Sequence, residues 1–204
     1  WSETKNLTFF EKYSIMVAVF IYVLSTVVLF YVNMHTERLY FKDLAARDPM
    51  TGLLNRRGMQ AVWRNKMTKK NVALAVFDID SFKTINDTYG HDVGDSAIQL
   101  VAKCIRDNIR HSDVASRFGG EEFTVLLPHT NQEQACYFAE RLRKRIEQEI
   151  VKVEDFLINY TISIGVCEYK PYFESHTQWL KSADAALYRA KENGRNQTCL
   201  HECD

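Results

Sequence analysis

The stretch "RFGGEEFTVLLP", from Arg117 to Pro128, places two glycines and two glutamates directly before an apolar run of strand length. A second apolar run, residues 71–79, contains Asp78 near its end and is followed at once by Asp80. If the two runs form neighbouring strands, Glu121 can lie beside Asp78 at one end of the sheet. Carboxylate oxygens, used one or two at a time with phosphate oxygens, are ligands that Mg²⁺ takes. The spacing therefore predicts a divalent-metal site.

The glycine pair fits the same interpretation. We expect Gly119 and Gly120 to form a two-residue hairpin turn with positive φ, and without Cβ atoms they let an anionic ligand approach the backbone. Neighbouring carboxylates repel each other, so without a cation between them the pKa of one should be raised. A solvated acidic hairpin also explains the glycines, but not a second acidic pair at the end of an apolar strand.

A metal with few protein ligands implies a phosphate-containing substrate, and candidate cations are present. Lys191 and Arg195 are four residues apart in "AKENGR", so they share one helix face. Lys83, three residues after Asp80, is a third candidate. Each of these cations alone is typical of a surface ion pair. Only the predicted carboxylate site supports their assignment as phosphate ligands.

The elements that must position these residues alternate along the chain. Hydrophobic periodicity and turn residues predict helices at 56–68, 92–110, 131–150 and 178–196, and strands at 71–79, 113–118, 121–128 and 156–169. Asn131 is a plausible N-cap, and Gly194 is a natural residue to end the last helix. The pattern predicts an α/β fold with a mixed or mostly antiparallel central sheet flanked by helices.

The N-terminal segment is different, because Tyr13 to Val32 contains no charged residue. A helix of this length spans about 30 Å, the thickness of a bilayer's hydrocarbon core. A buried core helix and a cleaved signal peptide are the alternatives, although a small-residue cleavage site is missing. We expect residues 1–12 to be the extramembrane end of an upstream region, because the chain lacks an initiator Met. Residues 13–32 form a transmembrane helix, 33–47 a connector helix, and 48–204 the main domain.

Charge and cysteine content narrow the function classes. Lys+Arg and Asp+Glu both number 26, which gives no argument for nucleic-acid binding. Arg38, Lys42 and Arg47 follow the span, and this excess places the main domain in the cytoplasm. The five cysteines form no CxxC pair, which indicates free thiols in a reducing compartment. Cys199 and Cys203 could pair or bind a metal, but we expect a frayed tail there.

Four motifs taken together resemble the GGDEF family of diguanylate cyclases. They are "DPMTGLLNRRG", "FDIDSFKTINDTYGHDVGD", "RFGGEEF" and "ADAALYRAKENGRN", in this order between Asp48 and about Asn196. The resemblance implies a palm-like fold related to nucleotide cyclases and polymerase palms, similar to a ferredoxin-like fold. It also implies a membrane-anchored member at the bacterial inner membrane.

The resemblance assigns roles residue by residue. It makes Asp78, Glu121 and the Ile79 carbonyl ligands of Mg²⁺ or Mn²⁺, Glu121 the catalytic base, and Glu122 the reserve candidate. Substrate positions are Asn86, His91 and Asp95, with Asn86 and Asp95 on guanine, and Lys83, Lys191 and Arg195 on the triphosphate. The implied reaction joins two GTP into cyclic di-GMP and two pyrophosphates between the facing domains of a homodimer.

"RHSD", Arg110 to Asp113, matches the family's inhibitory Arg-x-x-Asp site, and Arg141 matches its secondary arginine. Arg pairs bidentately with guanine O6 and N7, so the resemblance implies feedback inhibition by cyclic di-GMP. Ordinary charge at the entry to a strand is the alternative.

Other functions stay open at this stage. The chain could be an inactive cyclic di-GMP receptor, although none of the matched positions departs from the family pattern. It could be a phosphodiesterase or a mononucleotide cyclase with the same metal geometry, or a membrane-tethered structural domain. For the cyclase, we expect the span and residues 33–47 to pass a signal by changing how two domains pair.

Overall fold

The computed structural model describes residues 9–66, 71–153 and 156–201. The chain divides into two compact units, Trp1–Ala45 and Ala46–Asp204. The division of the chain into membrane, connector and main-domain segments stays a prediction.

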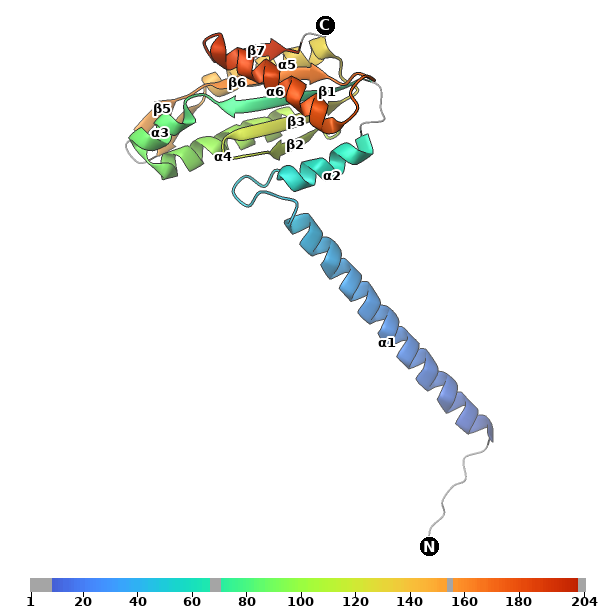
Figure 1. Cartoon of the computed structure of the whole chain (residues 1–204). Coiled ribbons are helices and arrows are strands. Elements are labelled where there is room, and N and C mark those ends of the chain that lie inside the picture. The colour runs from blue at the N-terminus through green and yellow to red at the C-terminus, as the bar shows by residue number, and fades with distance from the viewer. Residues whose placement is uncertain (1–8, 67–70, 154–155, 202–204) are drawn as a thin grey trace. The chain divides into compact units, whose positions relative to one another are not determined.

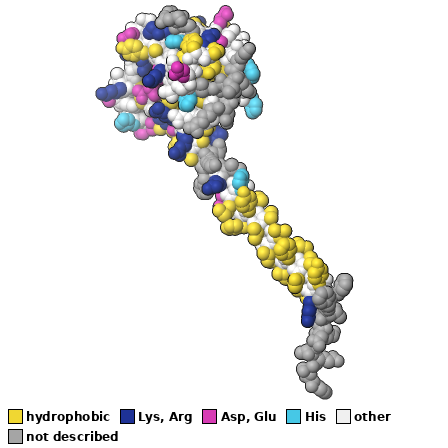
Figure 2. All heavy atoms as spheres, turned by 45° about the vertical axis from the view of Figure 1, so that its right-hand side comes forward, with side chains coloured by type: hydrophobic (Ala, Val, Ile, Leu, Met, Phe, Trp, Pro, Cys, Tyr) yellow, Lys and Arg dark blue, Asp and Glu magenta, His cyan; other side chains and the backbone are white. Residues whose placement is uncertain are grey.

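The first unit consists of one long helix, α1, Phe9–Leu44. Its segment Glu11–Arg38 is long and apolar enough to cross a membrane. The mean hydropathy of the segment is 2.6, and 0% of it is buried. Figure 2 shows hydrophobic side chains along the visible face of this helix. Because only length and composition support the span, its insertion in a membrane stays a prediction.

The second unit is built on a five-stranded sheet in the order β2-β3-β1-β6-β7 (Figure 1). Its strands are β1 Val72–Ile79, β2 Val114–Arg117, β3 Glu122–Pro128, β6 Ile162–Glu168 and β7 Thr198–Leu200. All neighbouring pairs are antiparallel except β6 and β7, which are parallel. A separate hairpin pairs β4, Ile150–Val153, with β5, Phe156–Asn159. The predicted α/β fold with a mostly antiparallel sheet is confirmed.

Helices cover both faces of this sheet. They are α2 Arg56–Lys66, α3 Phe82–Tyr89, α4 His91–Asn108, α5 Gln132–Glu147 and α6 His176–Glu192. Side chains of β1 alternate between two cores. Ala73, Ala75 and Phe77 pack in the core that contains α4 and α5. Leu74 and Val76 pack in the other core, with side chains of α2 and α6. The prediction of a central strand covered on both faces is confirmed.

The two helix signals read from the sequence are present. The Asn131 side chain accepts a hydrogen bond from the Gln134 N–H at 2.9 Å, and Gln134 Oε1 accepts one from the Asn131 N–H. This capping box starts α5. Asn193 ends α6, and Gly194 follows with φ 110°, the left-handed conformation that glycine adopts readily.

Several elements differ from the sequence-based expectation. The run 156–169 is divided into β5 and β6 by Tyr160 and Thr161, because β5 pairs with β4 and β6 with β1. The pattern also predicts no helix where α3 lies, since Ile85 is the one buried residue of that short helix. The expected helix to residue 150 ends at Glu147, and Ile150 begins β4.

The expectation of a frayed tail at Cys199 is wrong. This residue lies in β7 and pairs in register with Gly165. Cys203 lies outside the described residues. Cys104 and Cys167 are buried, and Cys136 and Cys199 are partly buried. The reducing compartment stays a prediction.

Candidate active site

The candidate site begins with Asp78 near the end of β1. In register, Asp78 faces Glu122 on β3 and Ser163 on β6. Residues directly opposite each other point to the same face of a sheet, so the Asp78 and Glu122 carboxylates share one face. Glu121 directly precedes the strand.

Electrostatics around Asp78 match the sequence-based expectation of a raised pKa. Asp78 is 6% exposed, and this burial raises its pKa by disfavouring the charged form. The Lys191 ammonium, 2.8 Å from Asp78 Oδ1, lowers the pKa, whereas Glu121 and Glu122 raise it further. The net pKa of Asp78 is raised, and burial is the largest cause.

The hairpin between β2 and β3, which contains Gly119 and Gly120, has a different turn from the one expected. Neither Gly119 nor Gly120 has a positive φ, and the Phe118 N–H donates to the Glu122 carbonyl at 2.7 Å. A Cβ added at Gly119 would lie 2.7 Å from Glu122 Oε2, whereas one added at Gly120 would meet nothing within 4 Å. The first glycine therefore makes room for the Glu122 side chain, and the second leaves the backbone open to a ligand.

Helix α2 and the turn before it hold this hairpin in place. The centroids of the Phe118 and Trp63 rings lie 5.7 Å apart. The Arg56 guanidinium carbon lies 4.8 Å from the centroid of the Phe118 ring. Arg117 Nη1 is 3.2 Å from Asp48 Oδ2. The "DPMTG" turn and α2 thus hold the end of β2 and the turn that leads to Glu122.

Asp184 on α6 is an acidic group near the site that the sequence pattern does not single out. Burial raises its pKa to about 6, Glu122 raises it too, and Arg56 lowers it. No sequence signal could have found Asp184, because its helical position is typical of an exposed face. Its proximity to Glu122 arises only when α6 packs on the sheet, against β6 and β1.

Asp80 has a structural role, which differs from the initial interpretation of an acidic pair. Its carboxylate accepts hydrogen bonds from Thr161 Oγ1 and Ser163 Oγ, both at 2.6 Å, and from the Asn196 N–H at 3.0 Å. These bonds tie the end of β1 to β6 and to the loop after α6.

Candidate phosphate-binding groups surround the start of α3. Ser81 precedes this helix with φ 54° and gives no side-chain cap, so the first N–H groups of α3 lack intrahelical partners. Such helix N-termini favour anions. Lys83 lies exposed in the first turn of α3. Ser81 and Arg195 line a common cavity of about 670 Å³.

A buried acceptor lies between α3 and α4. Asn86 Oδ1 is buried and accepts no hydrogen bond from the described residues. A Cβ at Gly94 would lie only 1.9 Å from this oxygen, so glycine lets α4 approach Asn86. Asp95 follows Gly94, and His91 begins α4. An unpaired buried acceptor is costly for stability, and Asn86 Oδ1 faces α4 rather than solvent.

The family model "Diguanylate cyclase, GGDEF domain" matches residues 45–197. The chain belongs to the GGDEF family. Diguanylate cyclase A of Treponema denticola is 46% identical over 132 residues, covering 65% of this chain and 36% of the relative. Probable diguanylate cyclase DgcC of Escherichia coli is 39% identical over 169 residues, covering 80% and 45%.

Solved structures agree with the family assignment. The coiled coil and GGDEF domain of DgcB from Caulobacter crescentus, in complex with c-di-GMP, superposes with a TM-score of 0.77 at 30% identity. The match covers 87% of this chain and 96% of that chain. The present chain spans less than half the length of the two curated relatives.

The GGDEF site suits a divalent cation, as GGDEF cyclases generally require. Among the residues in view, no three His, Cys, Asp or Glu side chains converge on one point. Asp78, Glu121 and the Ile79 carbonyl are instead a sparse set of hard oxygen donors at the end of β1. Mg²⁺ is bound in this way, through one or two carboxylates plus substrate phosphates, so the residues present fit such an ion.

The three candidate inhibitory residues of the GGDEF domain lie together. Arg110, Asp113 and Arg141 line one cavity of about 110 Å³. Asp113 is 9% exposed, and its Oδ2 accepts a hydrogen bond from the Arg110 N–H at 2.8 Å. Arg141 Nη2 donates to the Asn108 carbonyl at 3.2 Å. A turn, rather than strand-entry charge alone, therefore organises "RHSD".

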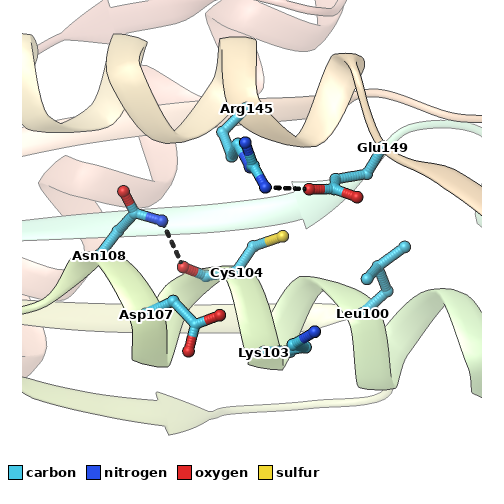
Figure 3. A pocket seen from close by; sticks show the side chains of 7 residues that line it. All are labelled: Leu100, Lys103, Cys104, Asp107, Asn108, Arg145 and Glu149. Carbon is cyan, nitrogen blue, oxygen red and sulfur yellow. Dashed lines mark hydrogen bonds and ion pairs between the residues drawn. The ribbon is translucent and has the colours of Figure 1, made fainter.

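Another cavity of the GGDEF domain, about 240 Å³, lies between α4 and α5 (Figure 3). Figure 3 shows Cys104 on α4 facing the Arg145–Glu149 ion pair, whose atoms are 2.8 Å apart. Burial raises the pKa of the Cys104 thiol, and Glu149 adds to this effect. The thiol is therefore neutral and a poor nucleophile, and the cavity contains none of the predicted site residues.

Proposed function

We propose that this chain is a diguanylate cyclase, which joins two GTP molecules into cyclic di-GMP and releases two pyrophosphates. The observation that carries the proposal is the acidic end of β1 and β3. There Asp78 faces Glu122 in register, Glu121 adjoins it, and Lys191 lies 2.8 Å from Asp78. Family membership and the complete signature support the same activity.

Guanine recognition is assigned to Asn86 and Asp95, beside His91. The Watson–Crick edge of guanine offers N1–H and N2–H donors, which a carboxylate accepts, and an O6 acceptor, which an amide NH₂ satisfies. The Asn86 oxygen faces Gly94 of α4, so we assign the Asn86 NH₂ group to guanine O6. Adenine would leave these groups unpaired, so we expect a strong preference for GTP.

The triphosphate is assigned to Lys83, Lys191 and Arg195, with the N–H groups at the start of α3. Charge and hydrogen-bond donors from three separate elements are suited to positioning a polyphosphate. Lys191 comes from α6, Arg195 from the loop after it, and Lys83 from α3.

We assign Mg²⁺, or Mn²⁺, to Asp78, Glu121 and the Ile79 carbonyl. When bound, the ion neutralises phosphate charge and polarises the phosphoryl group. Glu121 accepts the proton of the attacking hydroxyl, and Glu122 is the reserve candidate for this role.

Each of two domains binds one GTP, and the domains face each other as a homodimer. The 3′-hydroxyl of each GTP attacks the α-phosphorus of the other. A new P–O bond forms, the bond to the β-phosphate breaks, and pyrophosphate leaves. Positioning supplies most of the acceleration in such a reaction.

Location and control follow from the same proposal. We place α1 in the bacterial inner membrane and the catalytic domain in the cytoplasm. Cyclic di-GMP binds as product and inhibitor at Arg110, Asp113 and Arg141. Their common cavity supports this inhibitory site.

The test uses residues 46–204, which form one compact unit, and the Glu121→Gln variant. Each is incubated with GTP and Mg²⁺ at high protein concentration, and products are identified by mass. We expect cyclic di-GMP from the first protein and at least a 100-fold lower rate from the second. A different nucleotide product would point to another enzyme.

The second candidate function is an inactive cyclic di-GMP receptor, favoured by the preformed cavity around Arg110. No product from either protein, together with tight cyclic di-GMP binding that Arg110→Ala abolishes, would support this alternative. No nucleotide binding at all would leave a membrane-tethered structural domain.

A further inference from the structure

The loop that follows α6 carries a feature with no role in the proposed reaction so far. We propose that Asn196 is a positioning residue, which together with Arg143 and Glu147 of α5 holds Arg195 ready for the substrate's triphosphate. This inference rests on the proposed function, because it takes Arg195 as a phosphate ligand.

The backbone of this loop is strained. Arg195 has φ 65° and Asn196 has φ 46°, so two consecutive residues with side chains occupy the left-handed region. The left-handed region is unfavourable for arginine, which stays there only where surrounding contacts determine it, whereas asparagine adopts it at lower cost. Ending α6 requires only Gly194, so the two further left-handed residues need another explanation.

Asn196 supplies contacts that can maintain this strain. Its backbone N–H donates to Asp80 Oδ2 at 3.0 Å. Its side-chain Nδ2 donates to Glu147 Oε1 at 2.7 Å, and its Oδ1 accepts from Arg143 Nη1 at 2.7 Å. Asn196 thus joins the end of β1 to the last turn of α5.

The α5 side of this contact is rigid. Arg143 is 11% exposed and forms ion pairs with Glu140 and Glu147, both at 3.1 Å. The hydrogen bond from Asn196 lowers the pKa of Glu147, and the Arg143 guanidinium lowers it further. The Arg143–Glu147 ion pair therefore stays charged. A planar guanidinium with several fixed partners loses little further freedom when it binds another acceptor.

Arg195 lies next to this anchor. The Arg195 N–H donates to the Ala190 carbonyl at 3.0 Å. Arg195 also lines the same cavity as Glu147, Asn196 and Ser81, which precedes α3. The backbone of Arg195 is therefore fixed on both sides before substrate arrives. Fixing a binding group in advance lowers the entropic cost of binding.

The test is a swap of hydrogen-bond partners in the full chain, purified in detergent. Asn196→Ala removes both side-chain bonds, and Asn196→Asp places a carboxylate against Glu147. Adding Glu147→Gln to Asn196→Asp restores a donor–acceptor pair, because glutamine can donate to the new carboxylate while Arg143 still donates to it. Arg145→Gln is the control, since Arg145 lies on α5 but pairs with Glu149.

Binding is measured with 3′-deoxyguanosine triphosphate, which lacks the attacking hydroxyl, and with guanosine. For Asn196→Ala and Asn196→Asp we expect about tenfold weaker triphosphate binding and unchanged guanosine binding. With GTP as substrate, KM should rise about tenfold while kcat stays within about twofold. The double variant should recover most of the loss, and Arg145→Gln should behave like the unmodified chain.

Equal weakening of triphosphate and guanosine binding, or no rescue by the double variant, would overturn the inference by indicating general damage to the fold. Unchanged triphosphate binding in Asn196→Ala would also overturn it. An unmodified chain that binds the triphosphate but makes no cyclic di-GMP would contradict the proposed function alone, because the binding comparison would still decide the role of Asn196.

Discussion

The carboxylates at the end of β1 and β3 are unfavourable for stability taken by themselves. Asp78 is buried, faces Glu122 directly, and has one cationic neighbour in Lys191. Like charges directly opposite in a sheet destabilise it, and burial adds a desolvation cost. Strained or repulsive groups that persist are typical of sites whose function requires them.

Asp184 gives a pH-dependent prediction. Burial raises the pKa of Asp184 to about 6 in the folded chain, from an ordinary value of about 3.9. A raised folded-state pKa means that the folded state binds the proton more tightly, so stability is lost as pH rises from about 4 to about 6. Asp184→Asn should remove this loss, and urea unfolding at several pH values measures it.

The gain from Asp184→Asn should stay well below the ~1.4 kcal/mol per pKa unit of a fully desolvated group, because the Asp184 residue is exposed to solvent. Arg56→Gln is the complementary variant. Arg56 lowers the pKa of Asp184. Without the Arg56 charge, the pH range over which stability is lost should therefore extend to higher pH. Parallel stability curves for all three proteins between pH 4 and 7 would contradict the assignment.

At the residue scale, sequence reasoning predicts groups that share a motif and misses groups that meet only in three dimensions. The sequence predicts a raised pKa from the acidic residues at two strand ends, whereas burial is its largest cause and these residues add to it. Asp184 and Asn196 meet their partners only after α6 packs on the sheet, and no local pattern encodes these contacts. The turn at Gly119 has no positive φ, and a Cβ there would contact only the end of the Glu122 side chain.

At the element scale, strong periodicity predicts the central elements correctly. The apolar run of β1, the Asn131 cap and Gly194 each have a local physical cause, so they can be read from sequence. The short elements α3, β4 and β7 have at most eight residues each. Tertiary contacts rather than local propensity decide such segments.

The packing of α6 on β6 can be tested at Gly165. A Cβ there would lie 2.2 Å from the Ala183 carbonyl oxygen and 2.3 Å from the Leu187 nitrogen. Because these are backbone atoms, α6 must move as a whole. We expect Gly165→Ala to lower the free energy of unfolding by about 1–3 kcal/mol, measured as a lower urea midpoint.

Gly120→Ala is the matched control for stability, because a Cβ at Gly120 meets nothing within 4 Å. Its unfolding free energy should change by less than about 0.5 kcal/mol. Equal midpoints for Gly165→Ala and the unmodified chain would show that α6 can shift at little cost. It would then be a poor support for Lys191, which lies in its last turn.

At the scale of the whole molecule, the proposed reaction needs two copies of the domain, and the chain supplies one. Asp78, Asn86 and Arg195 can hold one GTP, but the attacking hydroxyl must come from a second bound GTP. The rate of an isolated domain therefore depends on how often two domains meet. An attached helix that dimerises would raise their effective concentration.

This dependence gives the last prediction. Residues 46–204 alone should show specific activity that rises with protein concentration. Replacing residues 1–45 by a parallel two-stranded coiled coil should make specific activity nearly independent of concentration and at least tenfold higher at low concentration.

Inserting seven residues between coil and domain preserves the heptad phase, whereas inserting four changes the facing of the two domains. Activity should survive the first insertion and fall with the second, as measured by cyclic di-GMP formation. Equal activity of all these proteins at every concentration would mean that one domain turns over without a partner, which the symmetrical reaction does not allow.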